Sequence, residues 1–397
     1  MKILMINKYL YSKGGAETYM LRLGEYLNTH GHDVQYFGMD HEAREVGNRV
    51  NVYTEELDFH NSGLLTRLTY PFKIIYSVQA RQKIRTVLDD FQPDVCHINN
   101  FNYQLTPSIL LEIRKWEWES GKKCRIIYTA HDPQLVCPNH MCMNPNTHQC
   151  CEKCLHGSFL NCTAGRCIHG SLGRSMLGSL EAWFWHSMKV YRHIDTIICC
   201  SRFMKCLLDT DPVLAEKTVA LHNFVEEVQQ RECRKKGYVL YFGRYSQEKG
   251  ITTLVQAAKQ LPQIPFVFAG AGPMESMLED VPNIRNVGFQ QGKALQTLIR
   301  EASFSVIPSE GYENCPFSVL ESIACGTPVL GANIGGIPEL IQGTGELFES
   351  GNVQDLTEKL GNLWKDAERL GTYTENCRNW SGMTPRDYVC QLLPYYH

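Results

Sequence analysis

The chain has 397 residues, 43% of them hydrophobic, which is enough for two globular domains with full cores. Its formal net charge of -3 argues against nucleic acid as the main partner, because phosphate binding needs a clustered positive field. No run approaches the roughly 18 apolar residues of a membrane span and the first apolar stretch is too short for a signal peptide, so we expect a cytoplasmic protein with mostly reduced cysteines.

Strand-like and helix-like segments alternate along the chain, which is the pattern that parallel sheets require. The expected strands are 2–6, 34–37, 95–98, 125–129 and 196–199 in the first half, and 238–242, 266–269, 284–287, 304–307 and 328–330 in the second. The charged stretch 226–236 is expected to be a linker. The sequence therefore predicts an α/β fold with two Rossmann-like domains, at 1–224 and 225–383.

A glycine pair follows the first strand. Gly14 and Gly15 allow close approach of the backbone to a bound group, and the helix expected over 17–26 directs its positive end the same way. An ordinary glycine turn is the alternative interpretation. Ligands of open parallel sheets bind beyond the carboxyl ends of the strands, and His131 follows the strand at 125–129 in the same manner.

The stretch from Phe59 to Leu88 contains no Asp or Glu. Basic and apolar residues interleave in it at roughly helical spacing: Leu64, Leu65, Arg67, Leu68, Phe72, Lys73, Ile75, Val78, Arg81, Lys83 and Arg85. One interpretation is a surface helix that docks on anionic lipid. The other is an amphipathic helix packed on its own sheet with a solvated basic face.

Seven cysteines lie between Cys137 and Cys167, in an apparent insert over 137–170. A C-x2-C pair and a second pair with four intervening residues could supply four thiolates to a tetrahedral zinc ion, and the segment is too polar for a core of its own. We therefore predict a structural zinc site at Cys151, Cys154, Cys162 and Cys167. Reduced thiols, a disulfide and an iron–sulfur cluster are the alternatives.

Two charged motifs occupy the second half. The strand at 238–242 leads into a glycine turn with Arg244 and Lys249, a cation pair suited to a diphosphate, although such a pair is often solvated surface. Downstream, Glu313 and Glu321 lie eight positions apart across the start of a helix. Pro316 suits the first turn of this helix, and Gly326 suits a left-handed stop after it.

These motifs resemble those of the retaining GT-B glycosyltransferases of the family-four type. In that family a G-R-x-x-x-x-K-G turn holds the donor diphosphate, and an E-x7-E motif binds the donor sugar and ribose. The resemblance implies that Arg244 and Lys249 hold the diphosphate, that Glu313 contacts the sugar hydroxyls and that Glu321 binds the ribose. The weaker motifs of the chain also fall in family order, and a subset of the family has a cysteine-bearing insertion at this place.

The resemblance also implies an architecture and further site residues. It implies two Rossmann-like domains that face a central cleft, with the helix over 384–397 packed back on the first, acceptor-side domain. Catalytic roles fall on His131, which borders the donor sugar, and on Arg244, Lys249 and Glu313. The remaining donor-binding residues are Gly14, Gly15, Gly272, Gly288, Phe289, Asn314, Cys315, Pro316, Phe317 and Glu321.

The activity implied is retaining transfer of a sugar from a nucleotide diphosphate, with UDP- or GDP-sugar favoured and no metal or other cofactor for catalysis. The acceptor implied is a glycan or a lipid-linked saccharide of cell-surface polysaccharide synthesis, with an anionic membrane surface on the inner face as a further partner. A catalytically silent nucleotide-sugar-binding subunit is the main alternative. A sugar-nucleotide epimerase and a nucleic-acid module fit the motifs poorly.

Overall fold

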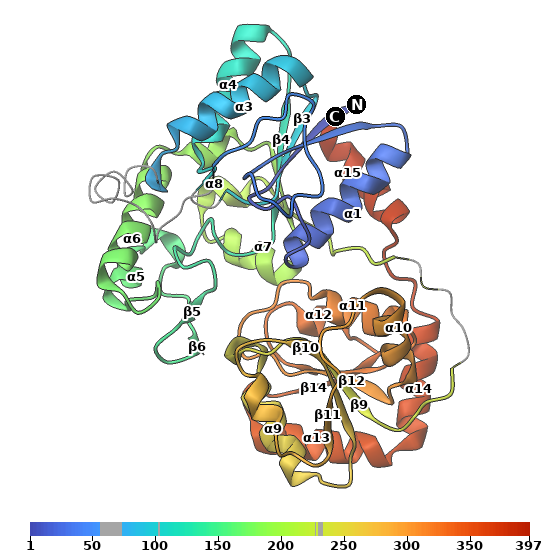
Figure 1. Cartoon of the computed structure of the whole chain (residues 1–397). Helices are drawn as coiled ribbons and strands as arrows, with labels where there is room; N and C mark the ends of the chain where they lie inside the picture. The colour runs from blue at the N-terminus through green and yellow to red at the C-terminus, as the bar shows by residue number, and fades with distance from the viewer. Residues whose placement is uncertain (56–73, 102–103, 227, 229–232) are drawn as a thin grey trace. The chain divides into compact units, whose positions relative to one another are not determined.

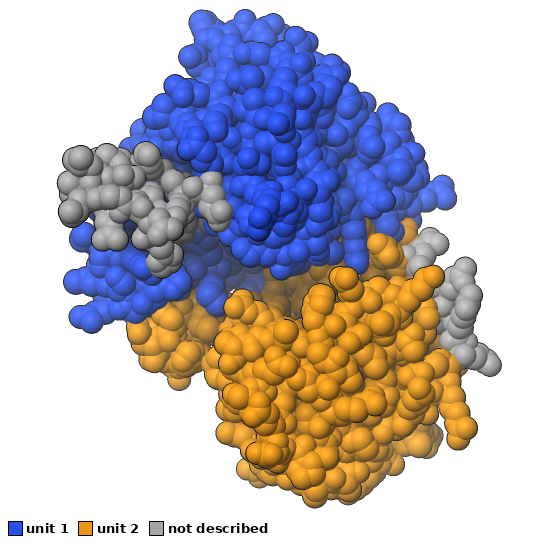
Figure 2. Space-filling model, in the orientation of Figure 1, with its two compact units in different colours: residues 1–141, 152–221, 385–397 blue, residues 142–151, 222–384 orange. Residues whose placement is uncertain are grey.

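The computed structural model describes residues 1–55, 74–101, 104–226, 228 and 233–397. The chain forms two compact units, coloured separately in Figure 2. Unit 1 contains residues 1–141, 152–221 and 385–397, and unit 2 contains residues 142–151 and 222–384. Residues 142–151 of the cysteine-bearing insert therefore belong to unit 2, and the rest of the insert belongs to unit 1.

Unit 1 is built on a six-stranded parallel sheet with the strand order β2-β1-β3-β4-β7-β8 (Figure 1). Its strands are β1 Lys2–Ile6, β2 Asp33–Phe37, β3 Val95–Ile98, β4 Arg125–Ala130, β7 Thr196–Cys199 and β8 Thr218–Ala220. Its helices are α1 Gly15–Thr29, α3 Val78–Phe91, α4 Ser108–Ser120, α5 Leu160–Ala164, α6 Leu172–Ser187, α7 Arg202–Leu208, α8 Pro212–Ala215 and α15 Pro385–Tyr396. The near-continuous burial of the strands is typical of a sheet covered on both faces.

Unit 2 repeats this plan with the strand order β11-β10-β9-β12-β13-β14, again all parallel. Its strands are β9 Val239–Arg244, β10 Phe266–Ala271, β11 Ile284–Asn286, β12 Phe304–Ile307, β13 Val329–Ala332 and β14 Gly345–Phe348. Its helices are α9 Ile251–Gln260, α10 Gly292–Glu301, α11 Phe317–Ala324, α12 Ile337–Leu340, α13 Val353–Lys365 and α14 Ala367–Arg378. A small antiparallel hairpin, β5 Met143–Asn144 and β6 Gln149–Cys150, comes from the insert.

The hydrophobic cores lie between the sheet and the helices that alternate with its strands, as the predicted alternation of strands and helices requires. In unit 2, α9 and α13 bury one cluster of apolar side chains against the sheet, including Leu254 and Leu360. Ile299 of α10 belongs to a second cluster with Leu240 and Val267 of the sheet. These clusters leave the carboxyl ends of the strands as the place for polar loops.

Helix α3 contains residues 78–88 of the basic, acid-free stretch; residues 59–73 of that stretch lie outside the described residues. The apolar side of α3 is buried, with Ala80, Ile84, Val87, Leu88 and Phe91 inside unit 1. Its cations are paired: Arg81 with Glu112, Arg85 with Asp89, and Lys83 with Glu55. This part of the stretch is a helix packed on its own unit. In the described parts of the chain, none of the helices has the length and apolarity needed to cross a bilayer.

Candidate functional site

The strand order reverses beside β1 in unit 1 and beside β9 in unit 2. Ligands of open parallel sheets bind at such reversal points, beyond the carboxyl ends of the strands. In unit 2, β9 pairs with β12, so the loops that follow these two strands start next to each other. The two charged motifs of the sequence lie on these two loops.

Lys249 and Glu313 meet at this point. The Nζ atom of Lys249 lies 2.6 Å from Oε1 of Glu313, and the hydroxyl of Ser309 donates a hydrogen bond of 2.7 Å to the same carboxylate oxygen. Burial lowers the pKa of Lys249, but the adjacent Glu313 carboxylate outweighs it, so the pKa lies above its ordinary value. The ammonium group therefore stays charged at neutral pH.

Two glycines make this contact possible. Gly250 has φ +71°, and a Cβ there would lie 1.7 Å from the carbonyl oxygen of Pro308, so the turn after Lys249 approaches the end of β12 more closely than a side chain allows. Gly335 has φ +58°, and its Cβ would lie 2.2 Å from the Glu313 carbonyl oxygen, which accepts a hydrogen bond from the Gly336 N–H. This support was not predicted; the signal for it in the sequence is the pair Gly335-Gly336 after a buried strand.

Arg244 ends β9, and its side chain is exposed. The positive charge of Arg244 repels the Lys249 ammonium group and acts to lower the pKa of that lysine. No ion pair involves Arg244 among the residues that the structure describes. Arg244 and Lys249 therefore place two positive charges at this point, beside the carboxylates of Glu313 and Glu248, which also act on Lys249. A pair of cations of this kind can bind a diphosphate.

Helix α11 follows the loop that contains Glu313. It starts at Phe317, and Pro316 occupies the N-cap with extended backbone, one position before the first turn in which it was predicted. Cys315 is buried and held by Asn223, whose side-chain amide donates a 3.0 Å hydrogen bond to the Cys315 carbonyl. Gly326, with φ +73°, follows the helix as predicted. The partly buried Glu321 lies on the second turn.

The other residues predicted to bind the donor on this unit have different environments. A Cβ on Gly272 would lie 2.4 Å from the carbonyl oxygen of Tyr245, so this glycine lets the loop after β10 pack on the loop after β9. Gly288 has φ +69° with open space around it, and its N–H donates to Oδ1 of Asn286. Phe289 is 70% exposed. An exposed aromatic ring at the end of a sheet is available to a planar ligand.

In unit 1, His131 follows β4. Its Nε2 atom lies 3.1 Å from Oδ1 of Asn99, and its ring lies edge-on to Tyr19 at 4.8 Å between centroids. Burial lowers its pKa to about 3, so the imidazole is neutral at physiological pH. Gly14 is the extended N-cap residue of α1, and Gly15 is the first residue of that helix.

A buried polar network, not recognised in the sequence, joins β3 and β4 to the last helix. The Tyr19 hydroxyl lies 2.6 Å from that of Tyr388 and 3.3 Å from that of Thr129. His97 bonds Thr129 through Nε2 and Tyr396 through Nδ1, each at 2.6 Å. These side chains are all nearly fully buried. The only signal was a histidine inside an apolar strand.

The imidazoles of His97, which is fully buried, and of His131, which is partly buried, lead us to expect a loss of stability in acid. Desolvation holds the pKa of both His97 and His131 at about 3, below the ordinary value, so the unfolded chain binds more protons than the folded one as pH falls. Each should lower the free energy of unfolding by up to about 1.4 kcal/mol per pH unit below about pH 6.5. Urea unfolding between roughly pH 6 and pH 4 measures this slope.

His97→Gln should reduce that slope by about one proton, whatever its effect on absolute stability. His30→Gln is the matched control, because His30 is an exposed residue of unit 1. An unchanged slope in His97→Gln would contradict the assignment.

The predicted zinc site at Cys151, Cys154, Cys162 and Cys167 is not supported. Among the described residues, which include the whole insert, no group of three or more His, Cys, Asp or Glu side chains could hold a metal ion. Cys154 and Cys162 are instead buried in a small apolar cluster with Phe159 and Ala182, against which Cys167 packs. Cys151 belongs to the other unit. Cys154, Cys162 and Cys167 thus contribute apolar packing, as the reduced-thiol alternative expects.

The hairpin of the insert contacts the loop of the glutamate motif. The Cys150 thiol lies 3.5 Å from the carbonyl oxygen of Glu310, and a Cβ on Gly311 would meet the methyl group of Met143 at 3.0 Å. The Glu310 carboxylate accepts hydrogen bonds from Thr253 and Gln247, at 2.7 Å and 3.0 Å. The hairpin therefore packs three residues before Glu313.

Comparison with known proteins identifies the family. The model of Glycosyltransferase Family 4 matches residues 13–228, more than half of the chain, and the model of Glycosyl transferases group 1 matches residues 225–380. The chain belongs to glycosyltransferase family 4. An uncharacterised glycosyltransferase of Methanocaldococcus jannaschii is 28% identical over 195 residues, which are 47% of this chain and 54% of that protein. The chain thus spans about half the length of this relative.

Two other comparisons cover nearly the whole chain of this family-4 glycosyltransferase. An uncharacterised 42.6 kDa protein in the cps region of Klebsiella pneumoniae is 22% identical over 90% of this chain and 91% of its own. The structure of Anabaena HepE in complex with UDP has a TM-score of 0.69 and 15% identity, and the match covers 99% of each chain. This likeness, with the two parallel sheets, confirms the predicted GT-B fold class.

Proposed function

We propose that this family-4 glycosyltransferase moves a sugar, with retention of configuration, from a nucleotide diphosphate sugar to a glycan or lipid-linked saccharide. The observation that carries the proposal is the Lys249–Glu313 pair beside Arg244 at the strand reversal point of unit 2. In this proposal the two cations bind the diphosphate of the donor, and the adjacent Glu313 carboxylate binds the hydroxyl groups of its sugar. The UDP in the complex of Anabaena HepE supports a nucleotide donor, with UDP- or GDP-sugars favoured.

In this proposal the cations act on the leaving group. Arg244 and Lys249 neutralise the diphosphate as it departs, and the N–H groups at the start of α11 add to the positive field. Glu313, already fixed by Lys249 and Ser309, accepts hydrogen bonds from the sugar hydroxyls. Glu321 binds the ribose. The departing phosphate oxygen takes the proton of the acceptor, so transfer needs neither a protein base nor a metal.

Other predicted residues shape the donor site in this proposal. The backbone at Asn314, Cys315, Pro316 and Phe317 surrounds the sugar, and Gly272, Gly288 and Phe289 border the diphosphate and the base. From unit 1, Gly14 and Gly15 approach the donor through their backbone. His131 borders the sugar as a neutral hydrogen-bonding group, since burial keeps its pKa at about 3.

Nucleotide binding tests the proposal directly. A nucleotide that binds only the folded protein should raise its stability by about 2.7 kcal/mol at a hundred times the dissociation constant. A thermal-shift screen of UDP-, GDP- and ADP-sugars against the purified protein should therefore give one clear positive series. A screen with no shift at millimolar ligand would contradict the donor site.

The proposal also names the class of acceptor. We place this transfer in cell-surface polysaccharide synthesis on the cytoplasmic side of the membrane; the relative from the cps region of Klebsiella pneumoniae matches 90% of this chain. The alternative is a catalytically silent subunit that binds nucleotide sugar. Release of free nucleotide from the stabilising sugar donor, with acceptor extract present, separates the two, because a silent subunit stabilises without turnover.

A further inference from the structure

Exposed apolar side chains gather on one part of unit 1. Ten large hydrophobic residues are exposed among the described residues, and six of them lie between residues 160 and 188: Leu160, Leu172, Met176, Leu180, Trp183 and Met188. They are 47–78% exposed. Isolated exposed hydrophobic residues are ordinary on protein surfaces, but a concentration of this kind marks a binding surface.

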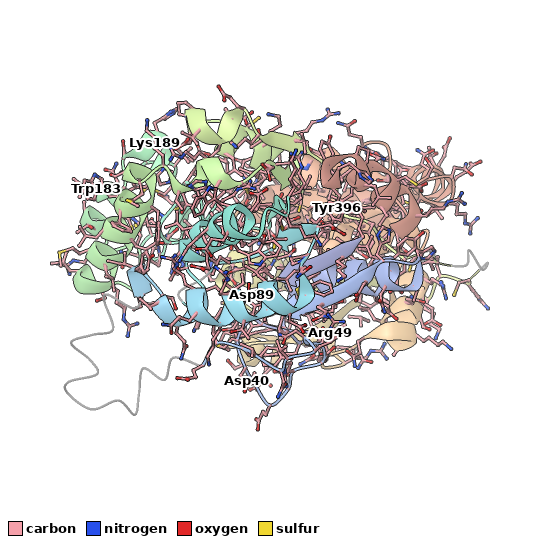
Figure 3. The ribbon with its side chains drawn as sticks, turned by 90° about the horizontal axis from the view of Figure 1, so that it is seen from above. Asp40, Arg49, Asp89, Trp183, Lys189 and Tyr396 are labelled. Carbon is pink, nitrogen blue, oxygen red and sulfur yellow. The ribbon has the colours of Figure 1, made fainter. Side chains whose placement is uncertain are left out.

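Four of these residues form a continuous face of α6. Leu172, Met176, Leu180 and Trp183 follow one another at intervals of four, four and three residues, which places them on one side of this 16-residue helix. Ser175, Gly178, Ser179, Ala182 and Trp185 bury the opposite side in unit 1. We call the four exposed residues the α6 apolar face. Figure 3 shows Trp183 on the ribbon of α6 and Lys189 beyond the end of the helix.

The chain segment that contains the α6 apolar face is rich in cations. From residue 153 to residue 192 the chain has five Lys or Arg and one acidic residue, Glu181. Burial raises the pKa of Glu181 to about 8, so this carboxyl group is mostly protonated at neutral pH. The five cations are all exposed, and in the described parts of the chain none forms an ion pair: Lys153, Arg166, Arg174, Lys189 and Arg192.

Helix α3 of the same unit shows the contrast. Its apolar side chains are buried and its cations have carboxylate partners within unit 1, so its charges are already neutralised. On α6 the arrangement is reversed: the apolar face is exposed, and the nearby cations form no ion pair with any residue that the structure describes. The partner of α6 must therefore offer hydrocarbon and negative charge together. The interfacial zone of an anionic bilayer offers both, and tryptophan is a preferred residue in that zone.

We propose that the α6 apolar face, with the exposed cations around it, docks this protein on an anionic lipid surface. The helix lies in the plane of the interface, with Trp183 and Leu180 among the acyl chains and Lys189 at the headgroups. The proposal goes beyond sugar transfer and does not depend on the identity of donor or acceptor. It places the docking surface outside the basic stretch at 59–88.

Vesicle flotation tests this surface. The full-length protein should float with vesicles of phosphatidylglycerol and phosphatidylcholine, and much less with phosphatidylcholine alone or at high salt. Trp183→Glu combined with Leu180→Glu should lower the partition coefficient at least about tenfold. Lys189→Glu should lower it more than about fivefold, because it replaces one attractive charge by a repulsive one.

Matched controls keep the result specific. Trp118→Glu alters a tryptophan of α4 that is 83% exposed, and Lys259→Glu alters an exposed lysine of unit 2; both variants should float like the original protein. All the substituted residues are exposed, so thermal unfolding should confirm folding in each variant. Equal flotation of the α6 variants and the controls would overturn the proposal. So would a protein that ignores anionic vesicles and instead forms a dimer that Trp183→Glu disrupts.

Discussion

Replacing Lys249 by alanine is expected to lower sugar transfer at least about a thousandfold, because one charged group that stabilises a departing oxyanion contributes about that much. In the proposed mechanism the negative charge on the leaving diphosphate grows as the glycosidic bond breaks. The turnover number should therefore fall more than the Michaelis constant for the donor rises. Steady-state kinetics with the sugar nucleotide found by thermal shift measures both quantities.

The structure supplies partner and control variants for this experiment. Glu313→Gln removes the charge that faces Lys249 but keeps an oxygen for the Ser309 hydroxyl, and should lower turnover at least about a hundredfold. Lys259→Ala removes an exposed lysine at the other end of α9 and should leave turnover unchanged. Full activity in a folded Lys249→Ala protein would exclude this lysine from the reaction.

Substituting alanine for Gly250 is expected to produce the largest loss of stability. The position has φ +71°, which costs an alanine about 1 kcal/mol, and the added Cβ would lie 1.7 Å from the carbonyl oxygen of Pro308. The two atoms nearest to this Cβ belong to the backbone of Pro308 and cannot move like a side chain, so the loops after β9 and β12 must separate. We expect the free energy of unfolding to fall by at least about 3 kcal/mol.

Gly237 provides a matched control for this effect. It has φ +70° but nothing within 4 Å of a built Cβ, so Gly237→Ala isolates the conformational cost and should lose only about 1 kcal/mol. Urea denaturation of both variants measures the difference. The same displacement should move Lys249 away from Glu313, so donor binding should weaken in Gly250→Ala and not in Gly237→Ala. Equal losses in the two variants would refute the close approach.

Much of the fold could be predicted because buried parallel strands leave a strong sequence signal. The strands at 2–6, 95–98, 196–199 and 304–307 have the predicted bounds, since each is a short apolar run between turns. The strands β8 and β14 were missed. Each has only three or four residues, and β14 is mostly half-buried, so neither shows an apolar run.

The site was predictable to a different extent in each unit. Lys249 and Glu313 were predicted on loops that follow parallel strands, but their contact depends on the adjacency of β9 and β12, which a repeated strand–loop–helix pattern does not specify. The zinc prediction failed because the spacing of cysteines says nothing about where their side chains point. Cys154 and Cys162 turn into an apolar cluster, whereas Cys151 belongs to a different unit. Periodicity likewise gave no sign of the hydroxyl partners of His97, because Thr129 lies 32 residues away on another strand and Tyr396 lies 299 residues away.

The return of α15 to unit 1 has a consequence for the order of folding during synthesis. Tyr388 bonds to Tyr19 of α1, and Tyr396 bonds to His97 of β3. Both α1 and β3 leave the ribosome hundreds of residues before α15. Domains usually fold in the order in which they are made. In this chain the buried hydrogen-bond network of unit 1 stays incomplete until the second unit has been translated, because residues 385–397 belong to unit 1. A chain stalled before residue 385 should therefore expose an incompletely folded unit 1 to chaperones and proteases.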